Sequence, residues 1–242
     1  MIKTIDLDRE TLVKMIDHTE LSACAGEKKI AKLCSEARRF GFHAVCINGA
    51  YTRYAKEKLA GSSVRVCTVA GFPFGAGSSS AKAYEAGEAV RNGASEIDMV
   101  IHIGALLAKK SDLVRDDIRA VVEASRPALV KVILETCFLT NREIVSGCRL
   151  AVEAGAAFVK TSTGFGTAGA IPAHVRLMRR TVGPDIGVKA SGGIKNLQDA
   201  RELIRAGASR LGLSASVAIV NALALEKSTP TEKQRQHGKR NV

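Results

Sequence analysis

Two lysines stand in short apolar stretches that share the pattern Val-Lys-(Thr/Ala)-Ser. Lys160 lies in "FVKTS" and Lys189 lies in "GVKAS". A single lysine in such a stretch is usually ion-paired or extends its ammonium group to solvent. Two neighbouring parallel strands in equal register would instead bring both ammonium groups together inside the protein, where repulsion and desolvation lower the pKa of an amine. An unprotonated lysine attacks carbonyl groups, so the pattern indicates Schiff-base chemistry.

Such chemistry also needs a group that moves protons. The best candidate is Asp98 in "EIDMV", which has apolar neighbours on both sides. The alternative is that Asp98 only neutralises a buried lysine, a role that is compatible with catalysis. We therefore predict a catalytic set of Lys160, Lys189 and Asp98.

Two glycine-containing turns could bind an anion. Gly192-Gly193 precedes a helix expected to start near Asn196, and Gly212–Ser216 follows the next strand. A glycine pair is by itself more often a tight turn, but backbone N–H groups after the last two strands of a barrel favour a phosphate site. The predicted substrate-binding residues are Thr163, Gly164, Gly192, Gly193, Gly212 and Ser214.

The segment Gly164–Gly169 also has the G-x-G-x-x-G spacing of a dinucleotide-binding turn, with Asp185 about 20 residues further on. However, Ile171-Pro172 separates its last glycine from the next helix, so no helix begins within the turn. The segment "GFPFGAGSSS" lacks the lysine of a P-loop and is expected to cover the barrel mouth. We predict neither a nicotinamide site nor a P-loop.

A repeated unit positions these residues: the tail of a helix, a glycine and an apolar strand. Six segments follow it: "RRFGFHAVCIN", "KLAGSSVRVCTVAGF", "RNGASEIDMVIHIG", "EAGAAFVKTSTG", "TVGPDIGVKASGG" and "RAGASRLGLSAS". Another strand, "ALVKVILET", follows Pro127, and "LVKMIDHT" near the N-terminus could supply the eighth. Strands rich in Val and Ile that alternate with helices predict a parallel sheet covered on both faces. We predict a closed (β/α)8 TIM barrel, with a doubly wound open sheet as the alternative.

The active site of such a barrel forms where the strands end at their C-terminal face. The polar residues expected there are Asp17, His18, Thr19, Asn48, Thr68, Asp98, Glu135, Lys160, Thr161, Ser162, Thr163, Lys189, Ser191 and Ser214. No linker divides the chain, so we predict one domain over residues 1–225. Residues 226–242 are polar, basic and without an apolar period, which predicts a disordered tail.

The composition excludes several classes of protein. No apolar run is long enough to span a membrane, so we predict a soluble, cytoplasmic protein. The six cysteines show no metal-ligand spacing, which predicts reduced thiols and no metal; Cys46 and Cys67 are expected to pack within strands. The net charge is +12, but the basic residues are scattered, so a phosphorylated small molecule is favoured over nucleic acid as the partner.

Seven motifs occur in order along roughly residues 12–220. They are "IDHT" (16–19), "VCIN" (45–48), "VCTVAGFPFG" (66–75), "EIDMVI" (96–101), "KVILET" (131–136), "VKTSTGF" (159–165) and "VKASGGI" (188–194). Together they resemble the deoxyribose-phosphate aldolase family, and so many ordered motifs make the resemblance highly specific.

The resemblance implies roles for three residues. Lys160 would be the Schiff-base lysine, Lys189 the second lysine that tunes it and shares in proton transfer, and Asp98 the acid and base. The reaction implied is the reversible cleavage of 2-deoxy-D-ribose 5-phosphate into D-glyceraldehyde 3-phosphate and acetaldehyde. The family needs neither a metal nor an organic cofactor. A homo-oligomer is compatible with the sequence, which does not fix the number of copies.

Three residues depart from the family pattern: Glu20, His102 and Leu213. They bear on substrate affinity more than on the type of reaction. Two other functions stay open. One is a sugar-phosphate isomerase or epimerase that uses Asp98 and Glu135 as acid and base while the lysines bind phosphate. The other is a non-catalytic protein that binds anions or nucleic acid through its basic tail.

Overall fold

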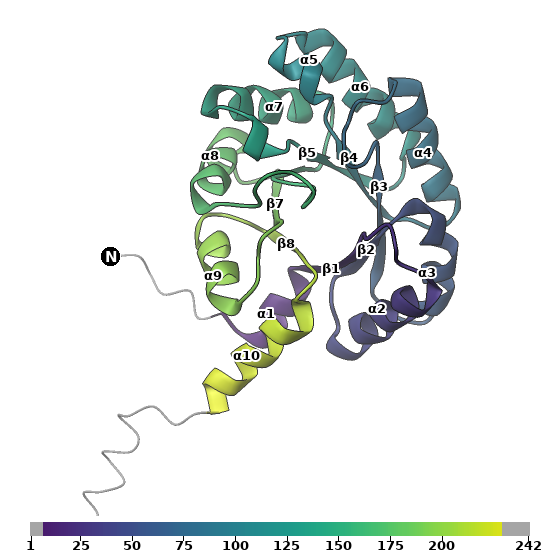
Figure 1. The fold of residues 1–242 in the computed structure, drawn as a ribbon, viewed down its shortest axis with the longest axis vertical. Helices are drawn as coiled ribbons and strands as arrows, with labels where there is room; N and C mark the ends of the chain where they lie inside the picture. The colour runs from purple at the N-terminus through teal and green to yellow at the C-terminus, as the bar shows by residue number, and fades with distance from the viewer. Residues whose placement is uncertain (1–6, 229–242) are drawn as a thin grey trace, which may run out of the picture.

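A computed structural model describes residues 7–228 as a closed barrel of parallel strands. The strands follow one another in chain order, and β1 pairs with β8 to close the barrel. Figure 1 shows the strands enclosed by a ring of helices. The strands are β1 (Ile16–Glu20), β2 (Ala44–Ile47), β3 (Arg65–Ala70), β4 (Glu96–Val100), β5 (Leu129–Ile133), β6 (Phe158–Lys160), β7 (Gly187–Ser191) and β8 (Arg210–Leu213). The predicted (β/α)8 barrel is confirmed, and the doubly wound alternative is wrong.

The helices alternate with these strands. They are α1 (Arg9–Lys14), α2 (Glu27–Phe40), α3 (Thr52–Lys58), α4 (Ser79–Arg91), α5 (Ile103–Leu107), α6 (Ser111–Ala124), α7 (Asn141–Glu153), α8 (Pro172–Val182), α9 (Leu197–Arg205) and α10 (Ser216–Ser228), with 3₁₀ helices η1 (Gly49–Tyr51) and η2 (Thr136–Phe138). Within residues 7–228, none of these helices combines the length and the apolar character needed to cross a membrane.

Both ends of the predicted domain differ from the expectation. Leu12 and Val13 belong to α1 and not to the first strand, because Asp8 caps that helix by accepting a hydrogen bond from the Thr11 N–H at 2.7 Å. At the other end α10 continues to Ser228, so residues 226–228 are helical. Residues 229–242 lie outside the described part of the chain, and the disorder expected there stays a prediction.

The glycine of each repeated unit has the backbone conformation that the pattern requires. All six have a positive φ: Gly41, Gly61, Gly93, Gly155, Gly183 and Gly207. Gly41 ends α2 at φ 73° and ψ 36°, and its N–H donates to the Ala37 carbonyl at 2.9 Å. This left-handed conformation is strained for residues with a Cβ. The glycines therefore turn the chain from each helix into the next strand.

Alternation along the strands separates an apolar layer from a polar interior. In β4, Ile97 and Met99 are fully buried in the large core between the barrel and the helices. Glu96 and Asp98 alternate with them and are also fully buried, but their side chains contact basic groups of other strands. Since successive side chains of a strand point to opposite faces, the carboxylates lie inside the barrel.

Candidate active site

Lys160 and Lys189 meet inside the barrel as predicted. They are register partners on β6 and β7, and both are almost completely buried. The Nζ atoms of both lysines lie 2.7 Å from the same oxygen of Asp98, Oδ2. The three residues predicted to be catalytic therefore form one hydrogen-bonded group.

The expected lowering of the amine pKa is wrong for Lys189. Burial lowers the pKa of Lys189, but the charges of Asp17 and Asp98 together outweigh burial and raise it above its ordinary value. Lys189 Nζ lies 2.5 Å from Asp17 Oδ2. Asp98 is the one carboxylate that the sequence pattern placed beside the lysines, but the folded barrel adds Asp17.

Three further charged residues of the barrel interior were missed: Glu96 of β4, Lys131 of β5 and Arg210 of β8. Lys131 Nζ lies 2.6 Å from Glu96 Oε2 and 2.8 Å from Asp98 Oδ1. Arg210 Nη1 lies 2.9 Å from Asp17 Oδ1 and 3.1 Å from Glu96 Oε2. The sequence does contain a sign that Lys131 faces the barrel interior. The segment "LVKV", in the strand that precedes the strand of Lys160, has the same Val-Lys pair.

Basic groups outnumber carboxylates in the barrel interior. The ion-paired network there consists of the basic residues Lys131, Lys160, Lys189 and Arg210 and the carboxylates Asp17, Glu96 and Asp98, whereas the buried Glu135 bonds Thr163 and pairs with none of them. Arg65 also reaches Glu96 at 3.3 Å, but half of its side chain is exposed and solvated. The loss of one proton from a buried amine would therefore leave the interior electrically balanced. Among the described carboxylates, Lys160 pairs with Asp98 alone.

The basic groups keep the carboxylates ionised. Burial raises the pKa of Asp98, but Lys131, Lys160 and Lys189 outweigh burial and hold that pKa well below its usual value. The pKa of Asp17 is lowered in the same way against the effect of burial, chiefly by Lys189. Asp98 is thus ionised where it bonds the lysines.

Every predicted substrate-binding residue lines one cavity of about 180 Å³. Its lining is formed by Thr19, Leu21, Lys160, Thr163, Gly164, Ser191, Gly192, Gly193, Ile194, Gly212 and Ser214. Lys160 is the one member of the predicted catalytic set in this lining. A larger cavity of about 550 Å³ is bordered by Arg53 of α3 and Glu85 of α4 and includes none of the catalytic set. The smaller cavity is the candidate site, because it contains Lys160 and all of the predicted substrate-binding residues.

The glycines of the G-x-G-x-x-G match pack one loop against another. A Cβ on Gly169 would lie 2.1 Å from the carbonyl oxygen of Gly192, too close for any side chain. The next residue, Ala170, donates its N–H to that oxygen at 3.0 Å. Helix α8 begins at Pro172, beyond the glycines, as predicted. Glycine is therefore required at position 169 because the two loops approach closely, and this requirement does not involve a dinucleotide.

Glu135 orients Thr163 toward the cavity. Its carboxylate accepts hydrogen bonds from the Thr163 N–H at 3.2 Å and from the Thr163 hydroxyl. Glu135 is buried and adopts a left-handed conformation, φ 56°. The isomerase alternative requires Glu135 and Asp98 to act as a free acid and base. It is not favoured, because the Glu135 carboxylate is hydrogen-bonded to the N–H and hydroxyl of Thr163.

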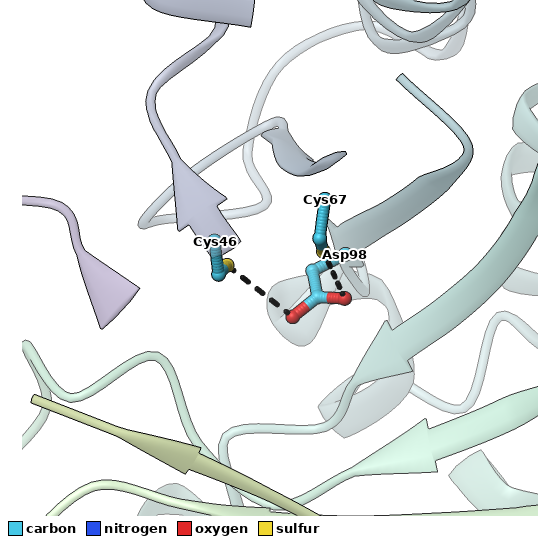
Figure 2. A group of neighbouring side chains, drawn as sticks. All are labelled: Cys46, Cys67 and Asp98. Carbon is cyan, nitrogen blue, oxygen red and sulfur yellow. Dashed lines mark hydrogen bonds between the residues drawn. The ribbon is translucent and has the colours of Figure 1, made fainter. Parts of the chain in front are cut away.

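Cys46 and Cys67 lie beside Asp98, as Figure 2 shows. They are register partners on β2 and β3, and their Sγ atoms lie 4.0 Å and 3.1 Å from the Asp98 oxygens. No sequence pattern indicated this group, because its members are far apart along the chain. Although the spacing suits metal ligands, a bound cation would face the ammonium groups of Lys131 and Lys189, which repel it.

The three departures from the family pattern lie outside the catalytic set. Glu20 accepts a hydrogen bond from the Ser22 N–H at 2.9 Å, and His102 Nδ1 caps α5 by accepting from the Ala105 N–H. Leu213 is buried in the core and is absent from the cavity lining. None of the three residues is part of the cavity lining.

Comparison with known proteins agrees with this site. The model of the DeoC/LacD family of aldolases matches residues 11–221. A deoxyribose-phosphate aldolase of Lysinibacillus sphaericus is 54% identical over 88% of this chain and 96% of its own length. One of Streptococcus pneumoniae is 57% identical over 86% of this chain and 95% of its own length.

Solved structures give the same result. A protein from Coccidioides immitis is 44% identical and superposes with a TM-score of 0.88 over 90% of this chain and 87% of its own. The deoxyribose phosphate aldolase of Aeropyrum pernix, described as a tetramer, is 34% identical with a TM-score of 0.82 over 90% and 92% of the two chains. By its sequence, its barrel and the extent of these matches, the chain belongs to the DeoC/LacD family of aldolases.

Proposed function

We propose that the chain is a class I deoxyribose-phosphate aldolase that reversibly cleaves 2-deoxy-D-ribose 5-phosphate into D-glyceraldehyde 3-phosphate and acetaldehyde. The observation that carries the proposal is the position of Lys160, whose amine lines a small polar cavity and shares one carboxylate oxygen with a second lysine. Family membership supports a lyase, and the close relatives carry this name.

Cleavage begins when the neutral amine of Lys160 attacks the C1 carbonyl of the open-chain sugar. Loss of water gives an iminium ion, which withdraws electrons from the neighbouring carbons. Removal of the proton from the C3 hydroxyl then breaks the C2–C3 bond, and the electron pair moves onto the iminium. The C3 fragment leaves as glyceraldehyde 3-phosphate. Protonation of the enamine at C2 and hydrolysis release acetaldehyde and restore the lysine.

Asp98 and Lys189 handle the protons of these steps. Asp98 Oδ2 lies 2.7 Å from both amines, so this oxygen can accept and return a proton at Lys160 while Lys189 stays protonated beside it. Lys189 keeps a positive charge behind the reacting amine, because its pKa is raised by Asp17 and Asp98 against the effect of burial.

The phosphate group of the substrate binds at the turns that follow β7 and β8. Gly192 and Gly193 both have a positive φ, 81° and 75°, and Gly212 and Ser214 complete this side of the cavity. Backbone N–H groups and small side chains suit a dianion there. Thr163 and Gly164 border the same cavity from the loop after Lys160 and contact the sugar.

The remaining expectations concern partners and location. We propose a phosphorylated sugar, and no nucleic acid, as the partner, because the basic residues of the sequence are scattered. The Aeropyrum pernix relative is described as tetrameric, which supports a homo-oligomer. A cytoplasmic location stays a prediction. Size-exclusion chromatography with light scattering tests the oligomer.

Reductive trapping tests the proposed function. Incubation with acetaldehyde and borohydride should leave an ethyl group on Lys160, found by peptide mapping. Lys82 is the internal control, because it is equally buried but pairs with Asp117 outside the barrel interior and should stay unmodified. An adduct mainly on Lys189 would reverse the two lysine roles. Absence of any adduct, with the sugar phosphate left uncleaved, would exclude the aldolase and favour the isomerase.

A further inference from the structure

His18 of β1 is buried but takes no part in the proposed mechanism. Its neighbours Asp17 and Thr19 face the barrel interior and the cavity. Because side chains alternate along a strand, the imidazole of His18 faces the opposite way, toward α2 and the start of α10. Its ring packs against Phe42 with a centroid distance of 5.1 Å, and only 3% of the residue is exposed.

Both nitrogen atoms of His18 have a partner. Nδ1 lies 2.9 Å from the hydroxyl oxygen of Ser216, and Nε2 lies 3.0 Å from a carboxylate oxygen of Glu36 on α2. Ser216 is the first residue of α10 and is completely buried. Its hydroxyl also lies 3.0 Å from the carbonyl oxygen of Leu213, the register partner of His18. The imidazole therefore joins β1 and α2 to the turn between β8 and α10.

The protonation state of His18 fixes the direction of these hydrogen bonds. Burial lowers the pKa of His18 although Glu36 opposes this effect, so the ring is neutral at pH 7. The carboxylate of Glu36 can only accept, so Nε2 carries the hydrogen. Nδ1 is then an acceptor, and the Ser216 hydroxyl donates to it, with the Leu213 carbonyl as a second acceptor within reach. The single hydroxyl hydrogen of Ser216 is thus shared between two acceptors, His18 Nδ1 and the Leu213 carbonyl.

The turn that Ser216 anchors carries part of the cavity. Gly212 and Ser214 line it together with Lys160, and Ser214 is two residues from the anchored serine. Both ends of the turn are fixed by β1: Gly212 is the register partner of Asp17, and Ser216 is bonded to His18. A shift of Ser216 would therefore move Ser214 relative to Gly192 and Gly193 across the cavity.

We propose that His18 is a positioning residue for the phosphate group of the substrate and holds the Gly212–Ser216 turn in place through the hydroxyl of Ser216. This inference rests on the proposed function. It separates His18 from the catalytic set, because the imidazole reaches the substrate only through the turn. A loss of His18 should weaken binding of the phosphorylated sugar and leave the chemical step at Lys160 intact.

The test compares kcat and KM for 2-deoxyribose 5-phosphate and for 2-deoxyribose in four variants. His18→Leu and Ser216→Ala should each raise KM for the phosphorylated sugar about tenfold, the effect of one lost hydrogen bond, and leave kcat and the KM for 2-deoxyribose within about twofold. His18→Asn should recover most of the lost affinity, because its amide can still bond Ser216 near the position of Nδ1. Ser125→Ala removes another fully buried serine and should change neither KM.

The double variant His18→Leu with Ser216→Ala sharpens the result. It should raise KM no further than either single variant, since both changes break the same link. Equal losses for the two sugars, or an unchanged KM for the phosphorylated sugar in Ser216→Ala, would overturn the positioning role. Failure of the unsubstituted protein to cleave either sugar or to form the adduct at Lys160 would instead reject the proposed function.

Discussion

Lys160 and Lys189 are register partners on adjacent strands, and their amines lie 2.7 Å from one oxygen of Asp98. The carboxylate stands between two groups that would otherwise repel each other. This geometry makes the charge count of the barrel interior the property to test, because each added or removed charge changes the electrostatic environment of the proposed reactive amine.

Lys189→Leu removes one cation from the interior and leaves three basic groups facing three carboxylates. Because a positive charge beside the proposed reactive amine is then gone, imine formation should move to higher pH by about one unit, which corresponds to about 1.4 kcal/mol. The measurement is the rate of adduct formation with acetaldehyde and borohydride against pH, taken separately from turnover. Lys82→Met, which breaks a buried ion pair outside the barrel, serves as the control. An unmoved profile in Lys189→Leu would leave that lysine with proton transfer or substrate binding only.

Lys131→Met should slow adduct formation at neutral pH by about tenfold or more for the same reason, although Lys131 is absent from the cavity lining. Its partner Glu96 lies 2.6 Å away and allows a second test. The double variant Lys131→Met with Glu96→Gln restores the surplus of one basic group. It should therefore form the adduct faster than Lys131→Met alone. Equal rates in the two variants would mean that the position of Lys131, and not its charge, matters.

Glu96→Gln should destabilise the fold in a pH-dependent manner. Burial raises the pKa of Glu96, but Lys131, His43 and Arg210 hold it far below its usual value of 4.5. A lowered carboxylate pKa contributes stability that is complete above pH 4.5 and is lost as the pH falls toward the pKa of the folded state. The variant should therefore lose about 3–5 kcal/mol of unfolding free energy at pH 7, and the difference from the unsubstituted protein should shrink below pH 4.5.

Urea denaturation at several pH values measures this difference. Ile97→Val in the same strand is the control, with an expected loss of about 0.5–1.5 kcal/mol that does not change with pH, because no charge is involved. A difference for Glu96→Gln that stays constant down to pH 3 would show that its charge adds no stability.

Gly192→Ala should raise KM for the phosphorylated sugar. Gly192 has φ 81°, and an added Cβ would lie 3.1 Å from Gly169 Cα, so the turn would have to shift at the proposed phosphate site. Gly41→Ala introduces a similar left-handed strain, φ 73°, at a position where a Cβ meets no atom within 4 Å. Both variants should lose about 1–3 kcal/mol of stability, but only Gly192→Ala should change KM. A normal KM in Gly192→Ala would show that this turn is structural.

The sequence by itself determined the barrel and the central pair of lysines. Six helix, glycine and strand units specify the alternation, and parallel pairing of neighbouring strands in equal register follows from the shared Val-Lys pattern. Such local features can be predicted from a sequence, because a helix cap, a strand period and a glycine turn each depend on residues close together along the chain. The seven ordered motifs indicated the aldolase family.

Only the tertiary structure decided which charges meet. Asp98 bonds Lys189, 91 residues away, and Arg210 bonds Asp17, 193 residues away, across the closed barrel. No local pattern encodes such contacts, because they depend on the closure of the sheet and on side-chain lengths inside it. The pKa of Lys189 was therefore predicted in the wrong direction from its neighbour on β6 alone. Electrostatic energies depend on every charge within a few ångströms, and the fold alone brings Asp17, Glu96 and Lys131 within that distance.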